Sequence, residues 1–153
     1  MTRLSSLKIV QAQSIATATL TVETPGDGFT DLTADVRHFI AQAAAVDGVV
    51  LLFLRHTSAS LVIQENADPD VQKDLTTALR RLAPEDAGWV HDTEGPDDMP
   101  AHVKAMLTGV GLHVPVAQGA LALGTWQGIY LIEHRFRPHR REVLLQFLGS
   151  RAG

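Results

Sequence analysis

The chain has 153 residues and no cysteine, so disulfide bonds and thiolate metal ligands are excluded. The 13 Lys and Arg residues against 17 Asp and Glu residues give a net charge of -4, which argues against a nucleic-acid-binding surface. The longest apolar run, residues 49–54, is far shorter than the roughly 20 residues of a membrane-spanning helix. We expect one domain over residues 1–153, in the cytoplasm, that binds neither nucleic acid nor a membrane.

The first half of the chain predicts strands on either side of a helix. Residues 17–23 alternate polar and apolar side chains, as in a strand with one face on the core, and residues 32–43 have the apolar spacing of an amphipathic helix. Two buried strands follow within residues 48–64. Asp68-Pro69-Asp70 then has the order of an N-cap, a proline at the first helical position and an acid in the first turn. This sequence predicts a second helix, which ends before Pro84 and buries a stripe that includes Leu75, Leu79 and Leu82.

The second half predicts a long loop, a short helix and several strands. Residues 84–100 are rich in Asp, Gly and Pro, and a loop of that length is more often functional than idle. A short helix that opens around residues 98–100 and closes at residues 108–109 is expected to turn Val103, Met106 and Leu107 inward. Strands are expected at residues 112–116, 121–123, 129–133 and 143–148. Together these elements predict an α+β fold with a mixed, mainly antiparallel sheet and about three helices.

Three histidines are candidates for a shared polar centre. His56 follows a predicted strand, His91 lies in the long loop and His102 lies near the start of the short helix. If folding brings them together, neutral imidazoles with a carboxylate from Glu65, Glu94 or Asp98 would suit a divalent ion such as zinc. The alternative is that these histidines are hydrogen-bonding groups that hold loops. No local motif of the HExxH type decides between the two interpretations.

Hydroxyl groups and glycine predict an anion site beside a flat ligand. Thr57 and Ser58 end one strand, and in the segment 124–127 the glycine permits close backbone approach while Trp126 can stack on a ring. No GxSxG motif is present, so a nucleophilic serine is not expected. The alternative is that Trp126 is a core or interface anchor. In the arginine-rich run 133–141, we expect Arg135 and Arg137 to be solvated and Arg140 and Arg141 to be available as anion ligands.

Four motifs resemble those of the YjbQ family, in the same order along the chain. They are HTSASL at 56–61, ENADPDVQKDL at 65–75, HDTEGPDDMPAHVKA at 91–105 and LALGTWQGIYLIEHR at 121–135. The resemblance extends over residues 48–149, whereas the first 30 residues are less distinctive. One departure is Phe136-Arg137-Pro138-His139, which stands where the family usually has a glycine-rich turn.

The resemblance implies a compact α+β domain that assembles as a homotrimer, with sites near subunit boundaries. It also implies a thiamine phosphate synthase activity, either as the main role or as a secondary one. In that reaction the thiazole nitrogen attacks the methylene carbon of hydroxymethylpyrimidine diphosphate, and pyrophosphate leaves. Such a site needs cations for the leaving diphosphate and a flat surface for the pyrimidine.

We assign the candidate residues to these roles. The polar centre that binds a metal (zinc or magnesium) or the diphosphate comprises His56, His91 and His102, with Glu65 and Asp74 as carboxylate partners. The substrate-binding residues are Thr57, Ser58, Asn66, Gly124, Thr125, Trp126, Gln127 and Arg141. Two other functions remain open, namely a trimeric protein that binds a phosphorylated metabolite without turnover and a metal-dependent hydrolase.

Overall fold

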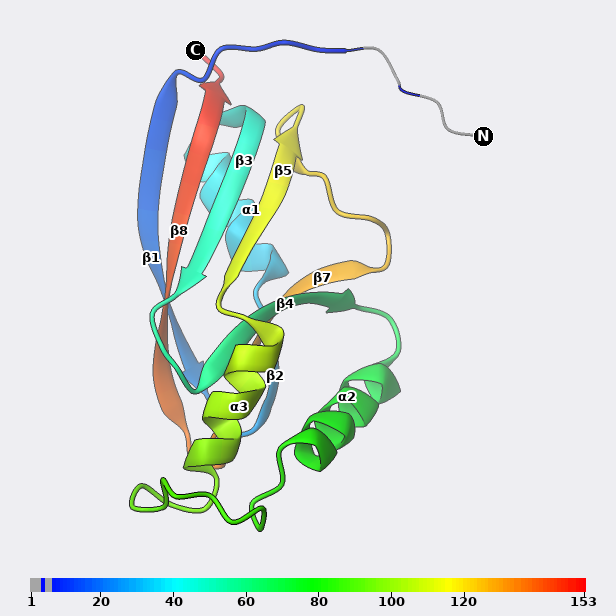
Figure 1. The fold of residues 1–153 in the computed structure, drawn as a ribbon. Helices are drawn as coiled ribbons and strands as arrows, with labels where there is room; N and C mark the ends of the chain where they lie inside the picture. The colour runs from blue at the N-terminus through cyan, green and yellow to red at the C-terminus, as the bar shows by residue number, and fades with distance from the viewer. Residues whose placement is uncertain (1–3, 5–6) are drawn as a thin grey trace.

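The strands of the protein form two antiparallel sheets (Figure 1), in a computed structural model that describes residue 4 and residues 7–153. The larger sheet has the order β1 (Ser14–Thr24), β8 (His139–Arg151), β3 (Ala45–Leu54), β5 (Gly111–Ala117) and β6 (Ala120–Leu121). The smaller sheet has the order β2 (Gly28–Asp31), β7 (Gln127–Glu133) and β4 (Ala59–Glu65). All strand pairings among the described residues are antiparallel, and with three helices they confirm the predicted α+β class.

Strand β8 is an interior strand of the larger sheet and lies between β1, at the edge, and β3. Its buried side chains Val143, Leu145 and Phe147 alternate with partly exposed ones, which is the pattern of a strand that covers a core with one face. Near its end, Gly149 lies opposite Gly48 of β3. A Cβ atom on Gly149 would lie 2.2 Å from the carbonyl oxygen of Asp47, so the close approach of the two strands requires glycine there.

Helix α1 (Thr33–Gln42) covers one face of the larger sheet and lies behind it in Figure 1. Val36, Phe39 and Ile40 of this helix are buried and belong to the main hydrophobic core. The same core includes Leu61 of β4 and Leu131 of β7, so α1 and both sheets share it. The helix predicted over residues 32–43 is therefore confirmed, together with its apolar face.

Helix α2 (Pro69–Leu82) starts as predicted but does not bury its apolar stripe. The side chain of Asp68 accepts a hydrogen bond from the Asp70 amide at 2.9 Å, and Pro69 occupies the first turn. No residue of α2 is buried, and Leu82 is 67% exposed. The predicted burial is wrong because spacing shows that a helix is amphipathic but does not show which element covers it.

Helix α3 (Asp98–Thr108) has the predicted bounds but packs on β4 with a different face. Its buried residues include Ala101, Lys104 and Ala105, whereas Met106 is 78% exposed and Leu107 is also exposed. The expectation that Met106 and Leu107 point inward is therefore wrong. The physical reason is that small alanine side chains allow the helix axis to approach the sheet closely, which larger side chains prevent.

The connection between α2 and α3, residues 83–97, is irregular and lies at the end of the molecule where α3 begins (Figure 1). This segment was predicted as a long loop, and it carries His91 and Glu94. None of the helices in the described part of the chain has the length and apolar content needed to cross a membrane.

Candidate functional site

His91, Asp98 and His102 form one compact group, the His-Asp-His cluster. Asp98 begins α3 and is buried, and His102 follows one turn later on the same side of the helix. The Nε2 atom of His91 lies 2.7 Å from Asp98 Oδ2, and the Nε2 atom of His102 lies 3.3 Å from the same oxygen. One ligand atom from each residue lies within 4.8 Å of the other two, so one ion can contact all three.

The Thr57 carbonyl fixes the orientation of the His102 ring. It lies 2.9 Å from His102 Nδ1, and because a carbonyl only accepts hydrogen bonds, Nδ1 must carry the proton. A neutral His102 ring then presents the lone pair of Nε2 to Asp98 Oδ2. Two such acceptors repel each other unless a proton or a cation lies between them. Ligand atoms of a tetrahedral zinc site are about 3.3 Å apart, so the spacing of His102 Nε2 from Asp98 Oδ2 fits a divalent ion. The 2.7 Å spacing of His91 Nε2 from the same oxygen is that of a hydrogen bond, which His91 would have to exchange for a bond to the ion.

Arg135 holds the loop before α3 in place. Its guanidinium donates to Asp97 Oδ2 at 3.0 Å and to the Glu94 carbonyl at 2.8 Å, and it also contacts Asp98 Oδ1. Burial alone would raise the pKa of Asp98, but the hydrogen bond from His91 and the charge of Arg135 together lower it below its ordinary value. Asp98 therefore stays ionised. The expectation that Arg135 is solvated is wrong, because acceptors from Glu94, Asp97 and Asp98 surround its guanidinium.

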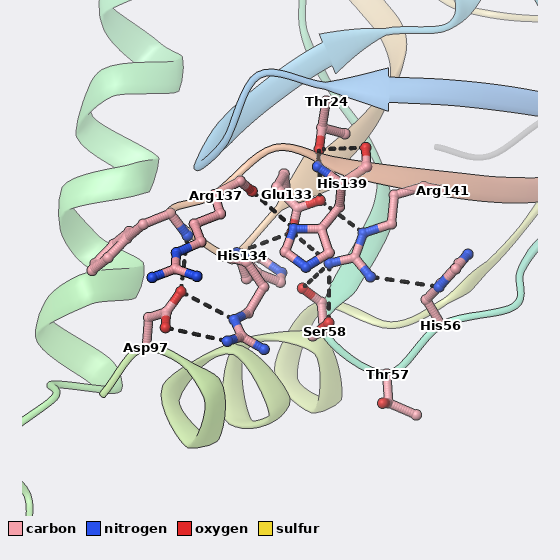
Figure 2. A network of polar contacts seen from close by, with 12 residues as sticks. Thr24, His56, Thr57, Ser58, Asp97, Glu133, His134, Arg137, His139 and Arg141 are labelled. Atoms are coloured by element: carbon pink, nitrogen blue, oxygen red, sulfur yellow. Dashed lines mark hydrogen bonds and ion pairs between the residues drawn. The ribbon is translucent and has the colours of Figure 1, made fainter. Parts of the chain in front are cut away.

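A second polar group is the buried ion pair of Glu133 and Arg141 (Figure 2). Arg141 Nε and Nη2 donate to the two Glu133 oxygens at 2.7 and 2.6 Å, and Nη2 also contacts Ser58 Oγ at 3.0 Å. Burial would raise the pKa of Glu133, but the Arg141 contact outweighs it and the pKa is lowered. The expected role of Arg141 as a free anion ligand is therefore corrected, because Glu133 occupies Nε and Nη2 and only Nη1 remains.

His56 lies beside this ion pair (Figure 2). It is not a member of the His-Asp-His cluster. The Glu142 amide donates to His56 Nε2 at 2.9 Å, so the neutral ring carries its proton on Nδ1. That Nδ1 lies 3.5 Å from Arg141 Nη1, which places two donors side by side. Burial and the neighbouring Arg141 charge lower the pKa of His56, which keeps the ring neutral. The expected centre of three histidines is thus corrected, because His56 is not among the grouped ligand atoms and its Nε2 already accepts the Glu142 amide.

A pocket of about 740 Å³, here called the main pocket, is lined by His56, which lies beside the buried ion pair, and by His102 of the His-Asp-His cluster. His56 and Thr57 contribute to its wall from the end of β3, and His102 contributes from α3. The remaining wall is largely apolar and is formed by Phe53, Leu54, Arg55, Ala105, Met106, Gly109 and Val110. The volume falls within the range of small-molecule sites.

Several predicted site residues lie at the opposite end of the smaller sheet. In the β4–β7 ladder, Ala59 pairs with Glu133 and Glu65 pairs with Gln127. A strand of 7 residues spans about 20 Å, so Glu65 is far from the main pocket of the same chain. Its carboxylate accepts a hydrogen bond from the Asp68 amide at 3.0 Å and supports the start of α2. Asp74 is exposed on α2. The expectation that Glu65 and Asp74 join the histidines is therefore wrong.

The segment 124–127 stays together with Asn66 at this distant end. Asn66 Nδ2 donates to the Thr125 carbonyl at 3.3 Å, and the Gly124 amide donates to Gln127 Oε1 at 2.8 Å. Trp126 is exposed and does not line the main pocket. Within one chain, the expectation that these residues bind the same substrate as Thr57 and Ser58 is therefore wrong, because antiparallel pairing places them beyond the other end of β4.

Sequence comparison places the chain among bacterial and archaeal relatives of similar size. It is 46% identical over 132 residues to a UPF0047 protein of Synechocystis, covering 86% of this chain and 90% of that protein. It is 41% identical over 133 residues to YjbQ of Salmonella typhimurium, covering 86% and 96% of the two chains.

Solved structures show the same fold. A YbjQ-like protein of unknown function from Sulfolobus solfataricus has a TM-score of 0.83 at 25% identity, over 90% of this chain and 99% of that one. A YjbQ/UPF0047 protein from Clostridium acetobutylicum has a TM-score of 0.80 at 35% identity, over 85% and 98%. The family model described as UPF0047 protein YjbQ-like matches residues 18–150. This chain therefore belongs to the UPF0047 YjbQ-like family.

Proposed function

We propose that the protein is a divalent-metal-dependent enzyme that binds a small phosphorylated metabolite in the main pocket. The observation that supports this most strongly is the position of His102. His102 is a member of the His-Asp-His cluster, and its side chain also forms part of the wall of the main pocket. A ligand in the pocket would therefore lie next to an ion held by the cluster.

The donor set of the cluster suits zinc better than magnesium. Two imidazole nitrogens and one carboxylate oxygen are typical of zinc sites that leave a position open, whereas magnesium prefers oxygen ligands. The Thr57 carbonyl orients His102, and Arg135 orients Asp98, which are the outer contacts that such a site needs. A bound ion would supply positive charge to the phosphate oxygens of a substrate.

The main pocket offers separate surfaces to a ring and to a phosphate. Phe53, Ala105 and Met106 form an apolar wall that a flat ring can contact. His56 lines the pocket, and its Nδ1 lies 3.5 Å from Nη1 of Arg141, which is buried behind it and does not itself line the pocket. An anionic oxygen placed between these two donors would accept a hydrogen bond from each.

The reaction that we propose is thiamine phosphate synthase-like transfer. A carbon–nitrogen bond forms between the pyrimidine methylene carbon and the thiazole nitrogen, and the carbon–oxygen bond to the diphosphate breaks. Charge develops on the departing diphosphate oxygens, where His56 Nδ1 and Arg141 Nη1 would donate hydrogen bonds. The apolar wall would hold the pyrimidine ring in line and keep water away from the reacting carbon.

The test is an assay with the two thiamine precursors, in the presence of zinc or magnesium. We expect product formation in the unmodified protein, with a loss of about 100-fold or more in His102→Ala and in His56→Ala. His38→Ala, at an exposed histidine of α1, is the control and should keep full activity. Elemental analysis should give one zinc per chain, which His102→Ala loses and His56→Ala keeps. Turnover that neither His102→Ala nor His56→Ala changes would contradict the assignment.

A metal-dependent hydrolase is the second candidate, and the imidazole-rich donor set favours it. It predicts hydrolysis of a simple phosphate ester such as p-nitrophenyl phosphate, with loss of activity after treatment with a chelator and recovery with zinc. Metal-free protein that keeps full activity would exclude this candidate. Saturable binding of the thiamine precursors without any turnover would instead support a metabolite-binding protein.

We also propose the homotrimer that the family resemblance implies. Phe53 and Met106 line the main pocket and are exposed at its mouth, so a neighbouring copy that covers them would bury apolar surface and close the pocket. A neighbour could also bring its segment 124–127 near this pocket, although the segment is distant within one chain. The cytoplasmic location expected from the sequence stays a prediction, which cell fractionation would test.

A further inference from the structure

Lys104 lines a second cavity on the other side of α3. Two positions along a helix correspond to about 200°, so Lys104 and His102 point to opposite sides of α3. The cavity has a volume of about 350 Å³ and lies between the end of α2, the start of α3 and the turn that contains Phe136. We refer to it as the Lys104 cavity.

The ammonium group of Lys104 is buried and has no partner. The residue is 4% exposed, and its Nζ atom makes no hydrogen bond or ion pair with any residue that the structure describes. Every fully buried side-chain nitrogen or oxygen of the described chain has a hydrogen-bond partner. Because Lys104 Nζ has no such partner, it must retain a small contact with solvent. The cavity that Lys104 lines is where this contact lies. A buried ammonium without a partner is costly, so such a residue requires an explanation.

Besides Lys104, three charged groups line the cavity, and two of them, Asp97 and Arg80, already have partners. Asp97 accepts hydrogen bonds from the Arg135 guanidinium and from the Phe136 amide, at 3.0 and 2.9 Å. Arg80 is paired with Asp27 at 2.5 Å. Only Glu85 lines the cavity as a carboxylate without a described partner, and its side chain is exposed at the surface. Asp27, Glu85 and Asp97 thus place negative charge near Lys104, but none of them forms an ion pair with its Nζ atom among the described contacts.

We propose that the Lys104 cavity binds a small anion, whose carboxylate or phosphate oxygens accept hydrogen bonds from Lys104 Nζ. Three ammonium donors suit either head group. The volume is near the lower limit for ligand sites, which favours a short organic acid or a phosphate monoester over a nucleotide. Phe136 and Pro100 provide an apolar wall for the body of the ligand.

The test is an NMR titration of the full chain with sodium phosphate and, separately, with sodium acetate. Sodium chloride at the same ionic strength corrects for screening. We expect saturable shifts of the amides of Lys104, Ala83 and Phe136, and the stronger of the two anions identifies the preferred head group. Lys104→Met should weaken this binding about tenfold or more. Lys73→Met, at an exposed lysine of α2, should not change it.

Two further variants separate this site from the main pocket and from simple misfolding. His56→Ala should retain the shifts around Lys104, because His56 lines the other pocket. In thermal unfolding, phosphate or acetate should raise the Tm of the unmodified protein but not that of Lys104→Met or Lys104→Gln. Without either anion, Lys104→Met should be at least as stable as the unmodified protein. An unmodified protein with no saturable shifts, or equal binding by Lys104→Met, would overturn the proposal.

Discussion

Glu133 and Arg141 are the residues whose removal should damage the protein most. Glu133 is 0% exposed in its side chain and Arg141 is 4% exposed. Each Glu133 oxygen accepts two hydrogen bonds. Oε2 accepts from the Thr24 hydroxyl and Arg141 Nε, and Oε1 accepts from the Arg135 amide and Arg141 Nη2. Breaking a buried ion pair leaves one charge without a partner, which costs more than the pair itself contributes.

Glu133→Gln should therefore lower the free energy of unfolding by about 3 kcal/mol. Glu23→Gln is the matched control, because Glu23 contacts Arg140 at 3.8 Å between two exposed side chains. That change should cost about 0.5 kcal/mol or less. Urea unfolding of the three proteins measures both effects. A Glu133→Gln protein as stable as Glu23→Gln would show that the buried pair does not stabilise the fold.

His134 should make stability depend on pH. Burial lowers the pKa of His134 to about 4, whereas an unfolded histidine titrates near about 6.5. The unfolded chain therefore takes up a proton at a higher pH than the folded one, and stability falls as the pH drops from about 6.5 to 4. The free energy of unfolding should fall by about 3 kcal/mol over this pH range because of His134.

The measurement is urea unfolding at several pH values with His134→Gln as the comparison. The glutamine amide can replace the contact of His134 Nε2 with Ser60 but does not titrate. The variant should therefore show a flatter dependence on pH between about 6.5 and 4.5 than the unmodified protein. Parallel curves for the two proteins would contradict the predicted role of His134.

The sequence allowed part of the candidate site to be predicted. His91 and His102 were placed together, and Asp98 was among three carboxylates considered. Its spacing of four residues from His102 is the signal that could have selected it. Arg135 and Glu133 could not be assigned, because their contacts come from segments distant in the chain. Local spacing carries no information about which buried carboxylate faces which guanidinium.

At the scale of elements, the close pairing of β3 and β8 at Gly149 sets the clearest constraint on sequence. The Cβ of an alanine at position 149 would lie 2.2 Å from the Asp47 carbonyl oxygen, so the strands would have to separate. Gly149→Ala should lower the free energy of unfolding by about 2 kcal/mol or more.

Gly111→Ala in β5 is the control for this change. A Cβ atom on Gly111 would lie 3.7 Å from the Leu52 carbonyl oxygen, which is an ordinary contact. Alanine there should change stability by about 0.5 kcal/mol or less. Thermal and urea unfolding measure both variants. Equal stability of the two variants would show that the strands can part at little cost.

The elements themselves were mostly predictable from periodicity and caps. The bounds of α3 and the N-cap of α2 agree with the expectation. Strand β2 was missed because its four residues follow a glycine-rich turn and show no alternation of their own. The exposed stripe of α2 and the reversed face of α3 were missed for another reason. A helix selects its buried face through its neighbours, and these are set by the whole fold.

At the scale of the whole molecule, the proposed homotrimer makes a direct prediction. Light scattering after size-exclusion chromatography should give a mass about three times the 16.5 kDa of one chain. Met106→Lys should shift the protein toward the monomer, because it places a charge on an exposed apolar residue at the pocket mouth. Thr77→Lys, at an exposed polar position of α2, is the control and should leave the mass unchanged. A monomeric mass for the unmodified protein would contradict the proposal.

The position of β8 between β1 and β3 also governs how the chain can fold during synthesis. The strand pairs residue 149 with residue 14 and with residue 48, so contacts of very long sequence separation hold the larger sheet together. Loop closure of that kind is slow, and β8 is the last of the described strands to leave the ribosome. Until then β1 and β3 have no strand between them, and their open edges are exposed to other nascent chains. A chain truncated before residue 139 should therefore expose unpaired edges of β1 and β3 and be prone to aggregation.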